Sequence, residues 1–153
     1  MKIRKAVKND LLNYVSLRRE DILEYSHIIK EDIKIDEEKL KKEFKDLIDS
    51  KENIVFIAEE GNELVGYLNG NILKNIWQES GYINDLFVTK NFKRKGVGTQ
   101  LIKSFIEYLK KKKIKKCKLG VNIKNTPAIA LYNELGFKTD HYEMSLNIWK
   151  WDY

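Results

Sequence analysis

One segment near the middle of the chain constrains both fold and chemistry. Residues 83–88 are mostly apolar and strand-forming, and a polar turn then leads through residues 93–98, Lys-Arg-Lys-Gly-Val-Gly, into an amphipathic helix. Glycine has no Cβ, so Gly96 and Gly98 would let an anionic ligand approach the backbone. The free N–H groups and the dipole of a helix's first turn favour negative charge. The segment therefore predicts a strand–loop–helix unit that binds a pyrophosphate group.

Two common phosphate-binding loops do not fit this segment. A Walker loop requires Gly-Lys-Ser/Thr, whereas Thr99 and Gln100 follow Gly98. A dinucleotide fingerprint requires a third glycine where Leu101 stands. The segment instead resembles Gln/Arg-x-x-Gly-x-Gly/Ala, the acetyl-coenzyme A loop of the GCN5-related N-acetyltransferases (the GNAT superfamily). Lysine at the first position, Lys93, keeps the charge but loses the bidentate fork. A basic turn before a glycine-rich helix start is the alternative interpretation of the loop alone.

A second block resembles the other signature of the same superfamily. Residues 125–137 read Asn-Thr-Pro-Ala-Ile-Ala-Leu-Tyr-Asn-Glu-Leu-Gly-Phe, against the superfamily's Asn-x-x-Ala-x-x-Leu-Tyr-x-x-x-Gly-Phe. The two blocks occur in the expected order and at the expected distance. The resemblance is close over residues 81–137 and loose over the rest of the chain.

Length and composition predict a single domain over residues 1–153, with 42% hydrophobic residues. Cys117 is the one cysteine, which excludes an internal disulfide, and we expect a structural thiol in a reducing compartment. His27 and His141 have no ligand context, so no metal site is expected. No apolar run is long enough for a membrane span, and the first residues lack a signal-peptide stretch. We expect a cytoplasmic protein with no membrane partner.

The formal net charge of +6 raises a nucleic-acid-binding domain as an alternative. However, the 23 acidic residues are interspersed among the 29 basic ones. The dense lysine run at 110–116 falls at the end of the long helix, where cations complement the dipole. No nucleic-acid partner is therefore expected, and surplus positive charge also suits a polyanionic coenzyme.

Hydrophobic periodicity and cap residues predict the element order β-α-α-β-β-β-α-β-α-β-β. Asp10 and Asp36 are expected to start the first two helices, and Gly61 the turn of a hairpin. Six of these seven strands can be assigned to residue ranges, which are 2–7, 54–58, 64–68, 81–88, 115–121 and 142–149. The resemblance implies an α/β (α+β) GNAT fold, with a mixed, mostly antiparallel sheet of six to seven strands and helices on both faces.

The resemblance also implies where acetyl-CoA would bind. In the GNAT fold two parallel strands, here 81–88 and 115–121, splay apart, and the pantetheine arm inserts between them as a strand would. The backbone of residues 86–88 would hold the acetyl and pantetheine groups, that of 94–99 the pyrophosphate, and Asn125 the pantetheine arm. The implied cofactor-binding residues are Leu86, Phe87, Val88, Lys93, Arg94, Lys95, Gly96, Val97, Gly98, Thr99 and Asn125.

Tyr132 matches the superfamily tyrosine that points at the thioester sulfur. A phenol with a pKa of about 10 is a weaker acid than a thiol with a pKa of about 8.5, but it can hydrogen-bond the departing thiolate. The resemblance therefore implies a catalytic donor at Tyr132. A core aromatic on a short helix is the alternative.

The acceptor side contains Asn84 and Asp85. Some relatives carry a catalytic glutamate where Gly120 stands here, and polyamine acetyltransferases carry one where Asn84 stands. We predict that Asp85 attracts a cationic amine and relays its proton, with Asn84 also binding the substrate. The alternative is an Asp85 carboxylate satisfied by local backbone N–H groups.

The expected function is acetyl-CoA-dependent acetylation of a primary amine on a small cationic molecule: a polyamine, an aminoglycoside or a streptothricin-like antibiotic. A protein or peptide N-terminal acetyltransferase and a non-catalytic acetyl-CoA-binding module are the alternatives. Dimers are common in the superfamily, so a homodimer is possible. Trp77, Trp149 and Trp151 could stack on a substrate, pack in the core or form a subunit contact.

Overall fold

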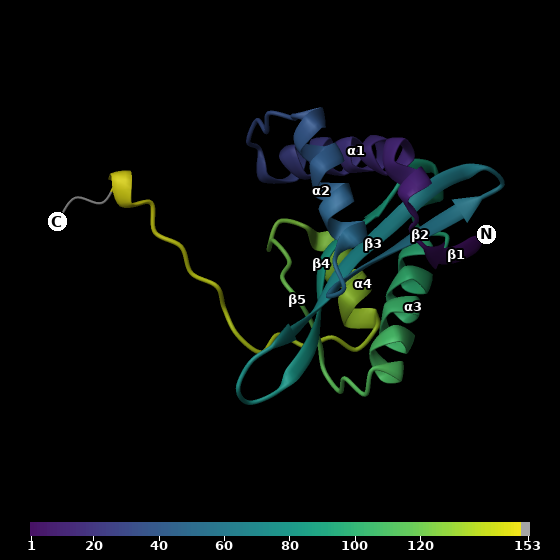
Figure 1. Ribbon diagram of the computed structural model, residues 1–153. Helices are drawn as coiled ribbons and strands as arrows, with labels where there is room; N and C mark the ends of the chain where they lie inside the picture. Colours follow the sequence, from purple (N-terminus) through teal and green to yellow (C-terminus); the bar gives the residue numbers. More distant parts are fainter. Residues whose placement is uncertain (151–153) are drawn as a thin grey trace.

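The computed structural model describes residues 1–150 as five strands, four α-helices and three short 3₁₀ turns (Figure 1). The strands are β1 (Lys2–Lys5), β2 (Asn53–Glu60), β3 (Glu63–Lys74), β4 (Glu79–Val88) and β5 (Cys117–Leu119). The α-helices are α1 (Leu11–Ile29), α2 (Glu37–Asp49), α3 (Val97–Lys111) and α4 (Thr126–Glu134). The 3₁₀ turns are η1 (Lys8–Asp10), η2 (Lys90–Phe92) and η3 (Ile148–Lys150).

The strands form one sheet in the order β1-β2-β3-β4-β5. All neighbouring pairs are antiparallel except β4 and β5, which are parallel. Gly61, with a φ of 60°, makes the tight turn between β2 and β3, since only glycine adopts left-handed backbone without strain. The predicted mixed, mostly antiparallel sheet is confirmed.

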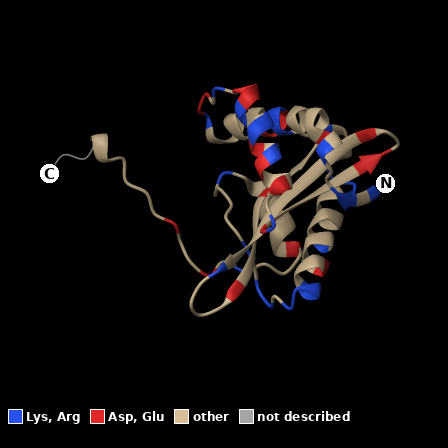
Figure 2. Cartoon of the chain, viewed as in Figure 1, with Lys and Arg blue, Asp and Glu red and all other residues tan. Residues whose placement is uncertain are grey.

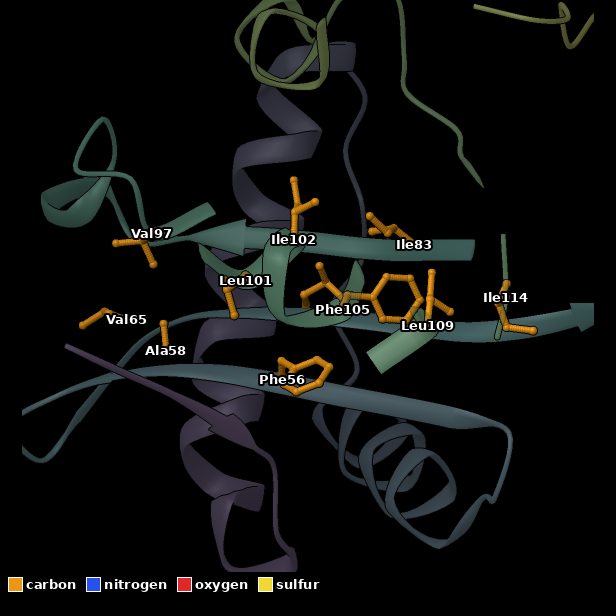
Figure 3. Close-up of a cluster of buried hydrophobic side chains, with 11 residues drawn as sticks. Phe56, Ala58, Val65, Ile83, Val97, Leu101, Ile102, Phe105, Leu109 and Ile114 are labelled. Atoms are coloured by element: carbon orange, nitrogen blue, oxygen red, sulfur yellow. The ribbon is translucent and has the colours of Figure 1, made fainter. Parts of the chain in front are cut away.

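Two apolar clusters lie on opposite faces of the sheet. Tyr14 of α1 and Phe44 of α2 pack with Tyr67 of β3 on one face. Leu101 and Phe105 of α3 pack on the other face, where Figure 3 shows them among Phe56, Ala58, Ile83 and further apolar residues. The prediction of helices on both faces is therefore also confirmed.

The first two helices begin directly after Asp10 and Asp36, as predicted. The Asp36 carboxylate accepts hydrogen bonds from the N–H groups of Glu38 (3.1 Å) and Lys39 (3.2 Å) at the start of α2. Asp10 is the residue before α1, and its carboxylate accepts two 2.9 Å hydrogen bonds from the guanidinium of Arg4. The Arg4–Asp10 pair thus fastens β1 to the first helix.

Charged residues of both signs are mixed over most of the fold (Figure 2). The helices α1 and α2 carry several ion pairs, among them Arg19 with Glu37 at 2.9 Å. The lysine run begins at the end of α3 and continues into the loop before β5, as expected from the sequence.

The expected strand count and the last strands are wrong. The described chain has five strands, where six to seven were predicted, and the strand expected at 115–121 is only Cys117–Leu119. Residues 138–147, within which the last strand was expected to begin, have no regular secondary structure and run away from the sheet (Figure 1). A strand needs a hydrogen-bonding partner, and this segment has none in the part of the chain that the structure describes.

Replacing Leu101 with alanine should lower the free energy of unfolding by about 3 kcal/mol, because the side chain is fully buried and leaves a cavity. The control is Leu12→Ala on α1, where the leucine is 71% exposed and the change should stay within about 0.5 kcal/mol. Urea denaturation of both variants measures the difference. Equal effects would contradict the assignment of the α3 face to the core.

Candidate active site

The parallel strands β4 and β5 pair only briefly and then separate. Their register covers Gly81 to Ile83 of β4, opposite Cys117 to Leu119 of β5. Beyond Ile83, β4 continues to Val88 and pairs only with β3. Among the described residues, the outer edge of Leu86, Phe87 and Val88 therefore has no strand partner, and its backbone can pair with a ligand.

A β-bulge lies where the two strands separate. Asp85 is opposite Asn69 and Ile83 is opposite Gly70, so Asn84 is the extra residue. A bulge bends the strand and reorients the side chains next to it. Here it leaves Asn84 exposed, with its amide donating to Asn71 (3.2 Å), while Asp85 joins the opposite face. Asn84 and Asp85 were both predicted to bind substrate, but their side chains contact different residues.

The loop after β4 leads into α3, and the first residues of this helix have N–H groups without a helical hydrogen-bond acceptor. Arg94 and Gly96 have left-handed backbone, with φ of 61° and 79°, and Gly96 caps the helix. The Gln100 N–H donates to the Gly96 carbonyl at 3.0 Å and makes the first helical hydrogen bond. The N–H groups of residues 97–99 precede this bond and have no helical acceptor. Arg94 and Lys95 are exposed beside them, so this site can receive an anion.

Lys93, the third basic residue of the loop, also contacts α1 and β4. Its ammonium pairs with Glu24 of α1 and lies 5.8 Å from the centre of the Phe87 ring. Lysine at the first loop position therefore links the loop to α1. The cationic side chains left for the loop are Arg94 and Lys95.

The short helix α4 packs directly against the start of α3. A Cβ added to Gly98 would lie 3.2 Å from Cδ2 of Leu131, a contact tighter than most in proteins. Asn125 caps α4, because its side-chain oxygen accepts from the Ala128 N–H at 3.3 Å. Gly98 therefore allows both a close ligand and a close helix, and α4 brings Tyr132 to the same region.

Tyr132 is half-buried on α4, with its ring 5.8 Å from that of Phe137. Burial, together with the negative charges of Asp21 and Asp85, raises the pKa of Tyr132 to about 12. Tyr132 is therefore close enough to both carboxylates for their charges to affect it. The phenol is thus protonated near neutral pH and can donate a hydrogen bond.

Asp85 is held by side chains rather than by local backbone N–H groups. Its Oδ2 accepts from the Asn69 amide at 3.3 Å, and its Oδ1 lies 3.4 Å from the Arg18 guanidinium. The alternative interpretation, satisfaction by nearby backbone, is not what the structure shows. Asp85 is a partly exposed carboxylate on the face toward α1.

Sequence reasoning missed a second carboxylate beside Asp85. Asp21 of α1 accepts hydrogen bonds from the Tyr67 hydroxyl (2.5 Å) and from Arg18 (2.7 Å). Glu43 of α2 contacts the same guanidinium at 3.3 Å. Burial raises the pKa of Asp21, although Tyr67 and Arg18 oppose the increase. Three carboxylates around one guanidinium leave a net negative site that suits a cation.

The pH dependence of stability should reveal Asp21. Because its pKa is higher in the folded than in the unfolded protein, Asp21 binds its proton more tightly in the fold. Its contribution to stability is therefore largest at low pH and is lost as pH rises above the ordinary value of 3.8. Relative to Asp21→Asn, the wild type should lose free energy of unfolding as the pH rises from about 4 toward neutrality.

Denaturation of the two proteins across this pH range measures the difference. The control is Asp32→Asn, which removes an exposed carboxylate between α1 and α2 and should follow the wild type. A difference between wild type and Asp21→Asn that stays constant with pH would contradict the assignment.

Burial raises the pKa of the Cys117 thiol to about 11, which suits a structural residue, as expected. In the part of the chain that is described, no group of three or more His, Cys, Asp or Glu residues could hold a metal. Nor does any helix within residues 1–150 have the length and apolar character needed to cross a membrane.

The sequence of this chain is similar to those of several known proteins. The model of the acetyltransferase (GNAT) family matches residues 16–137. An uncharacterized N-acetyltransferase of Methanocaldococcus jannaschii is 36% identical over 98 residues, which cover 62% of this chain and 43% of that protein. An N-alpha-acetyltransferase of Sulfurisphaera tokodaii is 33% identical over 92 residues, 54% of this chain and 55% of that protein. The chain thus spans about half the length of these relatives.

Solved structures share the fold over nearly the whole chain. A protein from Clostridium acetobutylicum, described as a predicted acetyltransferase with acetyl-CoA, superposes with a TM-score of 0.80. The match covers 99% of both chains at 19% sequence identity.

Proposed function

The chain belongs to the acetyltransferase (GNAT) family, and on that premise we propose that it transfers the acetyl group of acetyl-CoA to a primary amine of a small cationic molecule. The observation that carries the proposal is the open backbone edge of Leu86 to Val88, which leads into the glycine-lined start of α3. An extended ligand with a diphosphate at one end fits a strand edge that adjoins a helix N-terminus.

The backbone holds the cofactor. The N–H and C=O groups of residues 86–88 pair with the amides of the pantetheine arm, as a neighbouring strand would. The N–H groups of residues 97–99 take the pyrophosphate, with Arg94 and Lys95 adding positive charge. The Asn125 oxygen caps α4, so its amide nitrogen is the group that faces the pantetheine arm.

Acetyl-CoA supplies a thioester whose carbonyl carbon is open to attack by a neutral amine. Tyr132 donates a hydrogen bond to the sulfur as negative charge develops there. With a pKa of about 12, the phenol is a weaker acid than a thiol near ~8.5, so it stabilises the charge without giving up its proton.

The carboxylates act on the acceptor. A free alkylamine has a pKa near ~10.4 and arrives as an ammonium ion, which the net negative charge around Arg18 attracts. Asp85 is more exposed than Asp21 and takes the ammonium first. Asp21, whose pKa burial raises, is the better matched proton acceptor, reached from Asp85 through water.

A peptide N-terminus is the second candidate acceptor. The name of the Sulfurisphaera tokodaii relative favours it, at 33% identity over half of each chain. Glycine at position 120, where some relatives carry a glutamate, counts against it.

A panel of amines with acetyl-CoA separates the two candidates. Thiol release is measured with spermidine, an aminoglycoside, a streptothricin and peptides with free N-termini. We expect the highest kcat/KM with a small polycation, and Asp85→Asn should raise its KM by at least about tenfold. Asp32→Asn, an exposed change outside the site, should not. Preference for peptides, with Asp85→Asn unchanged, would support N-terminal acetylation instead.

A further inference from the structure

The guanidinium of Arg18 lies at the centre of a polar cluster on the sheet face that α1 and α2 cover. Its Nη1 is 2.7 Å from Oδ2 of Asp21, 3.3 Å from the Tyr67 hydroxyl and 3.4 Å from Oδ1 of Asp85. Its Nε is 3.3 Å from Oε1 of Glu43 on α2. Because the guanidinium is planar, the contact at Nε limits the directions in which Nη1 can point. One nitrogen thus joins the two carboxylates of the candidate acceptor site.

Asp21 is held by one of its two oxygens. The Tyr67 hydroxyl donates to Oδ2 at 2.5 Å, and Arg18 donates to the same atom, so neither of these donors holds Oδ1. Tyr67 is itself fixed, since its fully buried ring lies 4.9 Å from the ring of Tyr14 and 6.3 Å from that of Phe87, measured between ring centres. The carboxylate is therefore fixed in orientation, with one oxygen left to take a proton.

The surroundings of Asp21 decide when Oδ1 can accept that proton. Burial raises the pKa of Asp21, the Tyr67 hydrogen bond and the Arg18 charge lower it, and the negative charge of Asp85 adds to the increase. Burial also raises the pKa of Tyr67 well above its ordinary value, so its hydroxyl remains a donor. The charged and titratable groups near Asp21 are Tyr14 and Arg18 of α1, Glu43 of α2, Tyr67 of β3, Asp85 of β4 and Tyr132 of α4.

We propose that Arg18 and Tyr67 are positioning residues of the transfer, which hold Oδ2 of Asp21 and leave Oδ1 to accept the proton of the acceptor amine. The inference rests on the proposed acetyl transfer. The N–H bond of the ammonium breaks, its electron pair stays on nitrogen for attack on the thioester, and an O–H bond forms at Asp21. Because Arg18 also contacts Asp85, the carboxylate that binds the ammonium stays next to the one that takes its proton.

The test is the pH dependence of kcat in Tyr67→Phe, which removes the hydroxyl and keeps the packed ring. Asp21 accepts a proton only when it is ionised, so kcat should fall at low pH. Loss of the Tyr67 hydrogen bond raises the pKa of Asp21, so this fall should move to higher pH by at least about half a pH unit. The carbon-13 NMR signal of the Asp21 carboxyl, followed against pH without substrate, should move in the same direction. A residue that only supports the fold would lower kcat equally at every pH.

Tyr14→Phe is the matched control. Tyr14 is fully buried in the same apolar cluster as Tyr67, and within the described residues its hydroxyl has no hydrogen-bond partner. Its replacement should leave the pH profile in place. Arg18→Lys tests the other positioning residue, because it keeps the charge but lacks the planar fork that contacts Glu43 and Asp21 from different nitrogens. We expect its kcat to fall at least about tenfold.

Circular dichroism and titration with acetyl-CoA check that each variant is folded. An inactive wild type over the whole amine panel would overturn the proposed function and this inference with it. An active wild type gives a different result if Tyr67→Phe keeps its pH profile and its carbon-13 midpoint, or if Arg18→Lys keeps its kcat. Either outcome would overturn this inference alone.

Discussion

Replacing Gly98 with glutamate should raise the Kd for acetyl-CoA by at least about 100-fold. The new Cβ would lie 3.2 Å from Leu131, and the carboxylate would occupy the free N–H groups of the first turn of α3. An anionic side chain at a helix N-terminus competes directly with a diphosphate. Isothermal titration with acetyl-CoA gives the Kd of each protein.

The control for this prediction is Lys103→Glu on the same helix. Lys103 is exposed and lies beyond the first turn, and its replacement changes the charge by more than Gly98→Glu does. If charge alone governed binding, Lys103→Glu would weaken it more. We expect a change in Kd within about threefold, because a helix terminus acts only over its first turn. Wild-type affinity in Gly98→Glu would contradict the assigned phosphate site.

Replacing Tyr132 with phenylalanine should lower kcat by about 10²- to 10³-fold and leave the Kd for acetyl-CoA within about twofold. The phenol donates its hydrogen bond only as charge develops on sulfur, so its loss affects the rate more than binding. Burial and the charges of Asp21 and Asp85 raise its pKa to about 12, so the donor stays protonated across the working pH range. Steady-state thiol release, together with titration, measures both quantities.

Tyr25→Phe serves as the control for Tyr132→Phe. Tyr25 is a partly exposed tyrosine of α1, and its change should leave kcat unaltered. A Tyr132→Phe enzyme with wild-type kcat would show that the tyrosine is a packing residue on a short helix, the alternative that the sequence left open.

The loop and the short helix could be predicted because their physics is local. Glycine at 96 is needed for its left-handed backbone just before α3. Asn125 and Pro127 begin α4 at the position that capping rules predict. Each of these features depends on a few neighbouring residues, so a short motif is sufficient to identify it.

The acceptor side could not be predicted to the same extent, because it depends on tertiary contacts. Asp21 of α1 and Tyr67 of β3 are 46 residues apart and meet only when the helix packs on the sheet. The one available signal was Asn69, a polar residue that directly follows the apolar stretch 64–68 of β3 and donates a hydrogen bond to Asp85. The contact of Lys93 with Glu24 could not be predicted for the same reason, since Glu24 comes from a distant helix.

The tail illustrates a different limit. Alternation from Tyr142 onward predicts a strand, but a strand also needs a partner, which periodicity does not identify. The environments of the tryptophans could not be predicted from the sequence either. Trp77 and Trp149 are exposed rather than in the core, and Trp151 lies outside the described residues.

The central claim is that the protein moves an acetyl group from a thioester to an amine at the gap between β4 and β5. The most direct measurement is mass spectrometry of a reaction containing acetyl-CoA and a small cationic amine, with free thiol counted in parallel. We expect equal amounts of acetylated amine and free coenzyme A, and neither product with Gly98→Glu. Tight binding of acetyl-CoA without release of thiol over the whole amine panel would contradict the claim and indicate a binding module.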